Sequence, residues 1–196
     1  MKSFLALLAA LAAVLLLSSC NSPASDGHTD HQDGADGTST VETKPAEFND
    51  ADVAFATDMI PHHQQAVQMS ALVPERSTNP QVIELAAAVA AAQGPEIETL
   101  KVFLVQWGGG EAHDGHDTGA MQMPGMVDEG TMTKLASLNG NEFDALWLTS
   151  MIAHHEGAIE MANTELADGA NVDAKTLAQQ IVTTQQAEID QMRQMG

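Results

Sequence analysis

Two pairs of adjacent histidines are the side chains of this sequence best placed to bind a metal ion. Each pair has a methionine three residues before its first histidine and another seven residues after it. The candidate ligands are His62, His63, His154 and His155, with Met59, Met69, Met151 and Met161. Neutral imidazole together with thioether suits copper, as Cu+ or Cu2+, whereas imidazole alone suits zinc, copper or nickel. The sequence therefore predicts a transition-metal site, with copper the best fit and zinc possible.

The two histidine pairs lie in an internal repeat with an offset of 92 residues. Segment 55–69 aligns with segment 147–161. The same register continues without a gap from 49–104 to 141–196, with 15 identities in 56 aligned positions. Shared helical composition accounts for a handful of identities, but not for one register through two helices and the turn between them. We interpret the repeat as a duplicated helical hairpin.

A helical wheel places both histidines of each pair at the border of the apolar stripe. In the first copy Met59, His62, Ala66 and Met69 follow the 3-4-3 spacing of a bundle seam, and the second copy repeats this spacing. Burying a polar group without a partner costs about 1–3 kcal/mol. Because a metal ion would satisfy several imidazoles at once, we expect the four histidines to meet in the core around one.

The second helix of each hairpin carries polar residues at its own seam positions. They are Gln93, Glu96, Gln185 and Glu188, which we expect to orient metal-bound histidines without touching the metal. With a turn near residue 76, Gln93 is expected level with Met59, about one turn from His63. The alternative is a metal-free core, in which these residues only satisfy the histidines and methionine is apolar filler.

Start signals mark the helices that carry these residues. Asn49 and Asn141 are expected N-caps, and Asn79 with Pro80 starts a further helix. The turns, near Pro74–Thr78 and Asp168–Ala170, are short, which forces paired helices to be antiparallel. We therefore predict an all-α domain: a four-helix bundle of two antiparallel hairpins.

The expected domain spans 47–196, with hairpins at 49–105 and 141–196 and a linker at 108–130. A short helix is expected at about 131–138, before the second hairpin. Two prolines break the symmetry of the hairpins. Pro61 is expected to bend the first helix near its histidines, and Gly94–Pro95 to interrupt the second.

The linker is rich in glycine, histidine and methionine. Its candidate auxiliary metal ligands are His113, His116, Met121, Met123 and Met126. Thioethers in such a segment suit cuprous ion, and histidine next to aspartate suits cupric or zinc ion. The segment is equally consistent with a polar linker in which these residues are incidental.

The N-terminus predicts export. Residues 1–19 have a positive Lys2 and then an apolar run that is short for a bilayer span, which indicates a signal peptide. Leu17-Ser-Ser-Cys20 has the form of a lipobox, so we expect lipid on Cys20 and a polar, disordered tether at 20–46. An ordinary signal peptide cut nearby is the alternative. We expect the protein outside the cytoplasm, on the periplasmic or cell-surface side.

Composition excludes several classes of function. Cys20 is the only cysteine, so a lipidated chain has no disulfide, cysteine-ligated zinc or cysteine nucleophile. The formal charge of -20 argues against nucleic acid as a partner, and against contact with anionic membranes beyond the lipid anchor. The sequence shows no nucleophile constellation, phosphate loop or dinucleotide fingerprint, and we do not expect an enzyme.

The motif Met59-Ile-Pro-His-His-Gln-Gln-Ala66 and its second copy, Met151-Ile-Ala-His-His-Glu-Gly-Ala158, resemble the signature of the family called domain of unknown function 305. The Met-Pro-Gly-Met segment at 123–126 is also similar to that family. The resemblance covers roughly 49–196 and implies a ferritin-like four-helix bundle in exported bacterial proteins. It also implies copper binding through methionine and histidine in some members. Pro95 departs from the usual pattern of the second helix.

Three functions follow as hypotheses. The first is a copper-binding lipoprotein for buffering, resistance or trafficking. The second is a ferritin-like metal oxidase, although carboxylate-bridged di-iron sites draw a glutamate from each of four helices, and neither His-His helix has an inward glutamate three residues before its histidines. The third is a metal-free structural or partner-binding lipoprotein.

Overall fold

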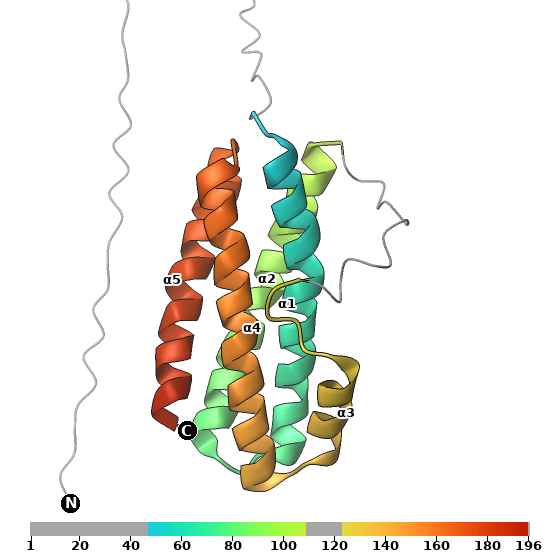
Figure 1. Cartoon of the computed structure of the whole chain (residues 1–196), viewed down its shortest axis with the longest axis vertical. Coiled ribbons are helices and arrows are strands. Elements are labelled where there is room, and N and C mark those ends of the chain that lie inside the picture. Colours follow the sequence, from blue (N-terminus) through green and yellow to red (C-terminus); the bar gives the residue numbers. More distant parts are fainter. Residues whose placement is uncertain (1–46, 109–122, 196) are drawn as a thin grey trace, which may run out of the picture. The chain divides into compact units, whose positions relative to one another are not determined.

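The structure, a computed structural model, describes residues 47–108 and 123–195 and is all-helical over them. The helices are α1 (Asp50–Arg76), α2 (Pro80–Gln106), α3 (Glu129–Ser137), α4 (Gly140–Asp168) and α5 (Val172–Met195). The four long helices form one bundle, and the short α3 lies against α1 and α4 (Figure 1). The predicted all-α bundle is confirmed.

Every pair of neighbouring long helices is antiparallel. The chain descends α1 and returns along α2, then ascends α4 and returns along α5 (Figure 1). The two hairpins are joined side by side, because α1 packs against α4 and α2 against α5. This arrangement brings the middle of α1 level with the middle of α4. No helix in the described parts of the chain is both long and apolar enough to cross a bilayer.

Side-chain caps start most of the helices. The Asn49 side chain accepts hydrogen bonds from the backbone N–H groups of Ala51 and Asp52, and Asp52 accepts from the Asn49 N–H at 2.6 Å. Asn79 caps α2 ahead of Pro80. Asn171 caps α5 by accepting from Asp173 and Ala174 at 3.0 Å each. These bonds satisfy N–H groups that a helix leaves free in its first turn.

The expected cap at Asn141 is wrong. The residue before α4 is Asn139, whose side chain makes no capping bond, and Asn141 lies inside the helix. The cause is Gly140, which has a φ of +59°. Glycine adopts this left-handed conformation without steric cost, so it turns the chain into the helix two residues earlier than expected.

The prolines disturb the helices less than the sequence suggests. The expected interruption of α2 at Gly94–Pro95 is wrong, because α2 continues to Gln106. Pro74 was expected to begin a turn, but it lies inside α1, which extends to Arg76. A proline removes only one backbone N–H donor, and buried residues on both sides, such as Gln93 and Ile97, hold α2 in the bundle.

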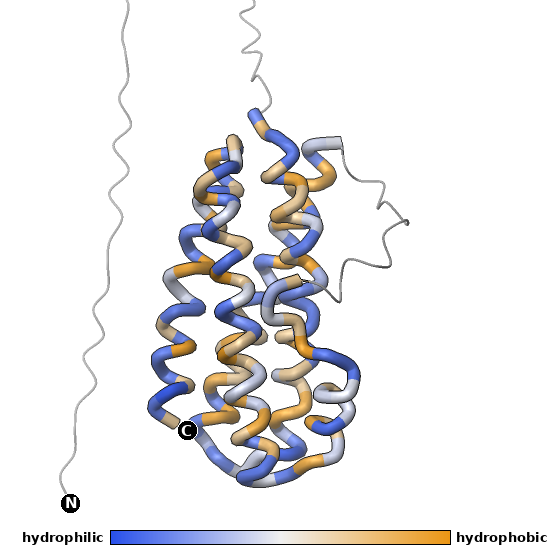
Figure 2. The backbone as a smooth tube through the Cα atoms, in the orientation of Figure 1, coloured by the Kyte–Doolittle hydropathy of each residue, from blue (hydrophilic) through white to orange (hydrophobic). Residues whose placement is uncertain are grey.

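The core consists of two apolar clusters, one at each end of the bundle. The first includes Met69, Val89, Trp147, Met151 and Ile189, and α3 adds Leu135 to it. The second includes Phe55, Met59, Leu100, Ala162 and Ile181. Along each long helix, hydrophobic and hydrophilic stretches alternate over a few residues (Figure 2), as expected for helices with one apolar face.

Candidate metal centre

A layer of polar side chains separates the two apolar clusters. On each long helix, its members lie between residues of the first cluster and residues of the second. We call it the histidine layer; it contains His62, His63, Gln93, Glu96, His154, His155, Gln185 and Glu188. All four histidines have 0% of their surface exposed. The burial expected from the helical wheel is confirmed.

His62 and His154 meet across the bundle. Their ring centroids are 3.8 Å apart and the ring planes are tilted by 41°. On α4 itself, the rings of His154 and His155 are 6.3 Å apart. The contact follows from the antiparallel pairing of α1 and α4, which brings the two histidine pairs to the same height.

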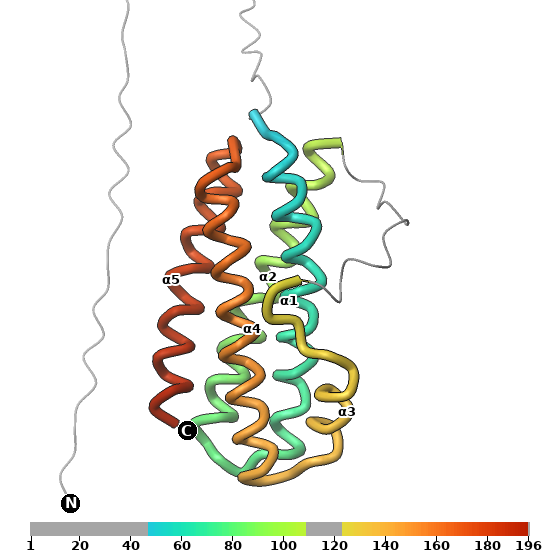
Figure 3. Tube along the Cα trace, in the orientation of Figure 1, coloured from blue at the N-terminus to red at the C-terminus, as the bar shows by residue number. Residues whose placement is uncertain are grey.

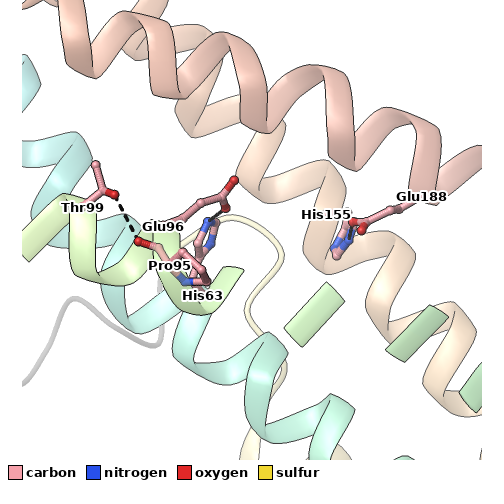
Figure 4. Close-up of polar contacts among 6 residues, drawn as sticks. All are labelled: His63, Pro95, Glu96, Thr99, His155 and Glu188. Carbon is pink, nitrogen blue, oxygen red and sulfur yellow. Dashed lines mark hydrogen bonds and ion pairs between the residues drawn. The ribbon is translucent and has the colours of Figure 1, made fainter. Parts of the chain in front are cut away.

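His63 and His155 each bind a glutamate of the second helix in their own hairpin (Figure 4). His63 Nε2 lies 2.8 Å from Glu96 Oε2, and His155 Nε2 lies 2.7 Å from Glu188 Oε2. A carboxylate oxygen only accepts, so Nε2 is the protonated nitrogen in both rings. Each bond spans 33 residues of sequence. The two hairpins therefore present the same imidazole–carboxylate pair.

The partner of His63 is Glu96, one of the two seam residues that the sequence offered on α2. Because α1 runs on to Arg76, the hairpin turns at residues 77–79, slightly later than expected. The later turn moves Gln93 from the level of Met59 towards that of His63. Glu96 lies about one helical turn further along α2, and its side chain reaches the ring from there.

The imidazole of His62 forms a hydrogen bond with a backbone carbonyl. Its Nε2 lies 3.0 Å from the carbonyl oxygen of Pro124, in the segment before α3. A carbonyl also only accepts, so Nε2 carries the proton here as well. Within residues 47–108 and 123–195, the matching residue His154 has no hydrogen-bond partner at either ring nitrogen. The two hairpins thus differ at the first histidine of each pair.

Among the described residues, several buried polar atoms of the layer have no hydrogen-bond partner. They include Nδ1 of all four histidines, and both side-chain polar atoms of Gln93 and Gln185. In a neutral ring, a hydrogen bond donated by Nε2 leaves the lone pair on Nδ1. A buried polar atom without a partner is costly and calls for an explanation. An imidazole with one nitrogen held by a carboxylate or carbonyl and the other bare is oriented like a metal ligand.

Burial keeps the imidazoles of His62 and His154 neutral. It lowers the pKa of His62 to about 4; the bond to Pro124 opposes this effect, and the nearby His63 and His155 add to it. Burial also lowers the pKa of His154 well below the usual value of 6.5, and the other three histidines reinforce the shift. Neutral imidazole is the form that binds a metal ion, so the pair is in its ligand form near neutral pH.

The four candidate methionines fall into two groups. Met59 precedes His62 by one helical turn and Met151 precedes His154 likewise, so each shares the histidine face of its helix. Both are fully buried. Met69 and Met161 lie two turns beyond the histidines, about 10 Å along the axis. There Met69 packs in the first apolar cluster and accepts a hydrogen bond at its backbone oxygen from Trp147.

The auxiliary residues are only partly visible. Met123 and Met126 lie in the half-buried segment that contacts His62. His113, His116 and Met121 lie outside the described residues, as do Cys20 and the tether at 20–46.

The layer fits a soft metal ion by its donors, but the donors are not gathered around one point. Within residues 47–108 and 123–195, no three His, Asp or Glu side chains are arranged to hold a metal ion. Nitrogen and thioether sulfur are donors for copper, and the available set is the two tilted imidazoles of His62 and His154, with Met59 and Met151 one helical turn before them.

Sequence reasoning missed three contributors to this site: the Pro124 carbonyl, Gln65 and Gly157. Gln65 donates to the Val127 carbonyl and accepts from the Val127 N–H. Gly157 lies against Pro124. The sequence did contain a signal for this contact: Gln65 and Gly157 occupy the same position of the two repeats, and one is large and polar where the other has no side chain.

Known proteins resemble the described bundle in both sequence and structure. A DUF305 protein from Streptomyces coelicolor is 33% identical, with a TM-score of 0.67, over 74% of this chain and 91% of that one. A DUF305 fragment from Deinococcus radiodurans is 30% identical, with a TM-score of 0.69, over 78% and 97%. CopM in its Cu(I)-bound form is 27% identical, with a TM-score of 0.62, over 74% and 94%.

CopM has also been solved in a Cu(II)-bound form, which is 28% identical to this chain with a TM-score of 0.61. No protein with a curated description matches the chain. The family described as "Domain of unknown function (DUF305)" matches residues 52–196, which include all five helices except the first two residues of α1. The chain therefore belongs to the DUF305 family.

Proposed function

We propose that this protein binds copper in the histidine layer and serves in copper buffering, resistance or trafficking. The observation that carries the proposal is the set of buried Nδ1 atoms. Four imidazoles meet between two apolar clusters, and three of them are held at Nε2 with Nδ1 bare. The similarity to CopM, a protein solved with Cu(I) and with Cu(II), supports copper as the metal.

The ligands we propose are His62 and His154, with Met59 and Met151 as nearby thioethers. His63 and His155 complete the donor set, each oriented by its glutamate. Glu96 and Glu188 bond to Nε2 of His63 and His155, the kind of contact that orients a histidine ligand and makes it a stronger donor. The mixed nitrogen and sulfur set suits Cu+, and the imidazoles with nearby carboxylates also accommodate Cu2+ or zinc.

The layer resembles a carboxylate-bridged iron centre less closely. Such centres draw a glutamate from each of four helices, whereas the layer in the described residues has two glutamates, each bonded to a histidine. This donor set favours binding of copper over iron oxidation.

We further propose that the protein is exported and lipid-anchored. The support is the sequence alone: an apolar signal segment at 1–19 followed by Cys20 in a lipobox. Metabolic labelling with a radioactive fatty acid tests the anchor. Label is expected on the full chain and not on the Cys20→Ser variant, and equal labelling of the two would refute the anchor.

Copper titration of the full chain tests the proposed site, under anaerobic conditions for Cu+ and aerobic conditions for Cu2+, with zinc as competitor. We expect tight binding of about one or two ions. In a variant with all four histidines changed to alanine, affinity is expected to fall by more than the roughly 10–100-fold that metal-site supporting residues contribute.

The control variant replaces two exposed polar residues of the same helices, Gln64→Ala and Glu160→Gln. Circular dichroism then establishes that helical content is retained. Unchanged affinity in the folded four-histidine variant would refute the proposal.

A further inference from the structure

A short segment lies across α1 and α4 at the height of His62 and His154. It spans Met123–Val127, is half-buried, and leads into α3 (Figure 3). We call it the strap. Its contacts reach both helices, because Pro124 and Val127 bond to residues of α1 and Gly125 lies against α4.

On the α1 side, Gln65 holds the strap by two hydrogen bonds. Its Nε2 donates to the Val127 carbonyl at 2.8 Å, and its Oε1 accepts from the Val127 N–H at 2.7 Å. A primary amide can both donate and accept in this way, whereas a carboxylate only accepts. Gln65 therefore fixes both the position and the orientation of the peptide groups at Val127.

On the α4 side, glycines allow the strap to approach the helix. A Cβ on Gly157 would lie 2.0 Å from the Pro124 oxygen. A Cβ on Gly125, whose φ is +78°, would lie 2.5 Å from the carbonyl oxygen of Ala153. Neither contact can be relieved by moving a flexible side chain, because both partners are backbone atoms. The close approach thus requires glycine at both positions.

The two anchors place the Pro124 carbonyl against His62. The oxygen lies 3.0 Å from Nε2, and a carbonyl accepts a hydrogen bond but cannot donate one. A neutral ring bonded in this way carries its proton on Nε2 and its lone pair on Nδ1. In the part of the chain that the structure describes, His154 on the opposite helix has no such carbonyl contact.

We propose that the strap, seated by Gln65 and Gly157, is a positioning device that fixes His62 as the Nε2-protonated tautomer and so selects Nδ1 as its donor nitrogen. The selection of Nδ1 as donor to a metal ion rests on the proposed function of the histidine layer. The assignment of the His62 tautomer does not, because it concerns the metal-free protein. Gln65 and Gly157 act through the strap and are not themselves ligands.

Nitrogen-15 NMR of the imidazole groups in the metal-free full chain tests the tautomer. A protonated nitrogen and a bare nitrogen of neutral imidazole have well-separated chemical shifts. We expect His62 to be almost wholly Nε2-protonated in the wild type. Gln65→Ala and Gly157→Ala are expected to give a mixture of tautomers at His62. A wild-type His62 protonated on Nδ1 would overturn the inference.

Two matched controls exclude general effects of substitution. Gln64→Ala removes an exposed amide from the same helix. Gly94→Ala adds a methyl group where the structure has no atom within 4 Å of its position. Both are expected to keep the wild-type tautomer. If Gly157→Ala fails to fold, Gln65→Glu decides, since it keeps the acceptor for the Val127 N–H but loses the donor for the Val127 carbonyl.

Copper titration of the same variants tests the consequence for binding. Gln65→Ala is expected to weaken copper binding about 10-fold, the low end for a residue that supports a metal ligand. A mixed tautomer with unchanged copper affinity would overturn the selection of the donor nitrogen. If the wild type binds no copper, the proposed function fails, while the NMR result still decides whether the strap sets the tautomer.

Discussion

The imidazole rings of His62 and His154 lie with their centroids 3.8 Å apart and none of either side chain exposed. They come from helices 92 residues apart in sequence and meet because α1 and α4 pack antiparallel. The contact places two neutral imidazoles, each with an unbonded Nδ1 among the described residues, next to one another in the core. Four predictions follow for this layer and for the bundle around it.

Met59 and Met151, one turn from the histidines, are expected to contribute to Cu+ affinity. Met69 and Met161, two turns away, are not. Leucine has nearly the volume of methionine but no sulfur, so each swap costs under about 1.5 kcal/mol of stability. We expect Met59→Leu with Met151→Leu to weaken Cu+ binding about 10-fold or more. The matched control is Met69→Leu with Met161→Leu. Cu+ affinity is measured by anaerobic competition with a Cu+ chelator. An equal loss of Cu+ affinity in the two double variants would contradict this assignment.

Glu96 and Glu188 are expected to strengthen copper binding through His63 and His155. Glutamine in their place keeps a hydrogen-bond acceptor for Nε2–H but removes the negative charge. We expect Glu96→Gln or Glu188→Gln to reduce copper affinity about 10–100-fold, with helical content unchanged. Glu98→Gln is the control, because that glutamate lies on the surface and pairs with Lys101. A variant of either buried glutamate with wild-type affinity would show that its charge does not support binding.

Acid is expected to destabilise the protein because His62 and His154 are buried neutral. The folded pKa of His62, about 4, lies below the ordinary value of 6.5. Between these values the unfolded chain binds a proton that the folded chain does not, so stability falls as pH drops from 6.5 towards 4. The slope is about 1 kcal/mol per pH unit.

Urea unfolding at several pH values measures this slope in the copper-free chain. His62→Gln is expected to reduce it, because glutamine does not titrate. The exposed substitution Glu160→Gln is the control and is expected to keep it. An unchanged acid slope in His62→Gln would mean that His62 is not the group responsible.

At the far end of α4, Glu165 is expected to make the bundle less stable as the pH rises. Its side chain is buried, and burial raises its pKa to about 8, with the side-chain contact to Asp52 and the Asp52 charge adding to the shift. Asp52 keeps its own charge: burial opposes ionisation, but backbone N–H groups of Asn171 and Asn49 outweigh it and lower the Asp52 pKa.

Between pH 4.5 and 8 the folded chain keeps a proton on Glu165 that the unfolded chain has lost. The stability present below pH 4.5 is therefore lost progressively up to pH 8. Glu165→Gln is neutral at every pH, and we expect it to be more stable than the wild type at pH 8 by about 1–3 kcal/mol. The exposed Glu160→Gln serves again as control. A variant no more stable than the wild type at pH 8 would contradict a protonated Glu165.

The sequence alone determined which side chains enter the core. Helical periodicity fixes the face of a residue whatever its partner, so the burial of all four histidines followed from spacing. The turn residues implied antiparallel hairpins, and the seam positions gave Glu96 and Glu188 as candidate partners. These properties are local, because each depends on a few neighbouring residues.

Only the tertiary structure decided how these side chains meet. The sequence left both Gln93 and Glu96 as candidate partners of His63, and the packing of α2 against α1 selected Glu96. The strap contact of His62 spans 62 residues, and the pairing of Asp52 with Glu165 joins opposite hairpins. Such contacts depend on how whole helices slide and rotate against one another, which no local spacing encodes. They place the Pro124 carbonyl against Nε2 of His62 and bring the His62 and His154 rings together.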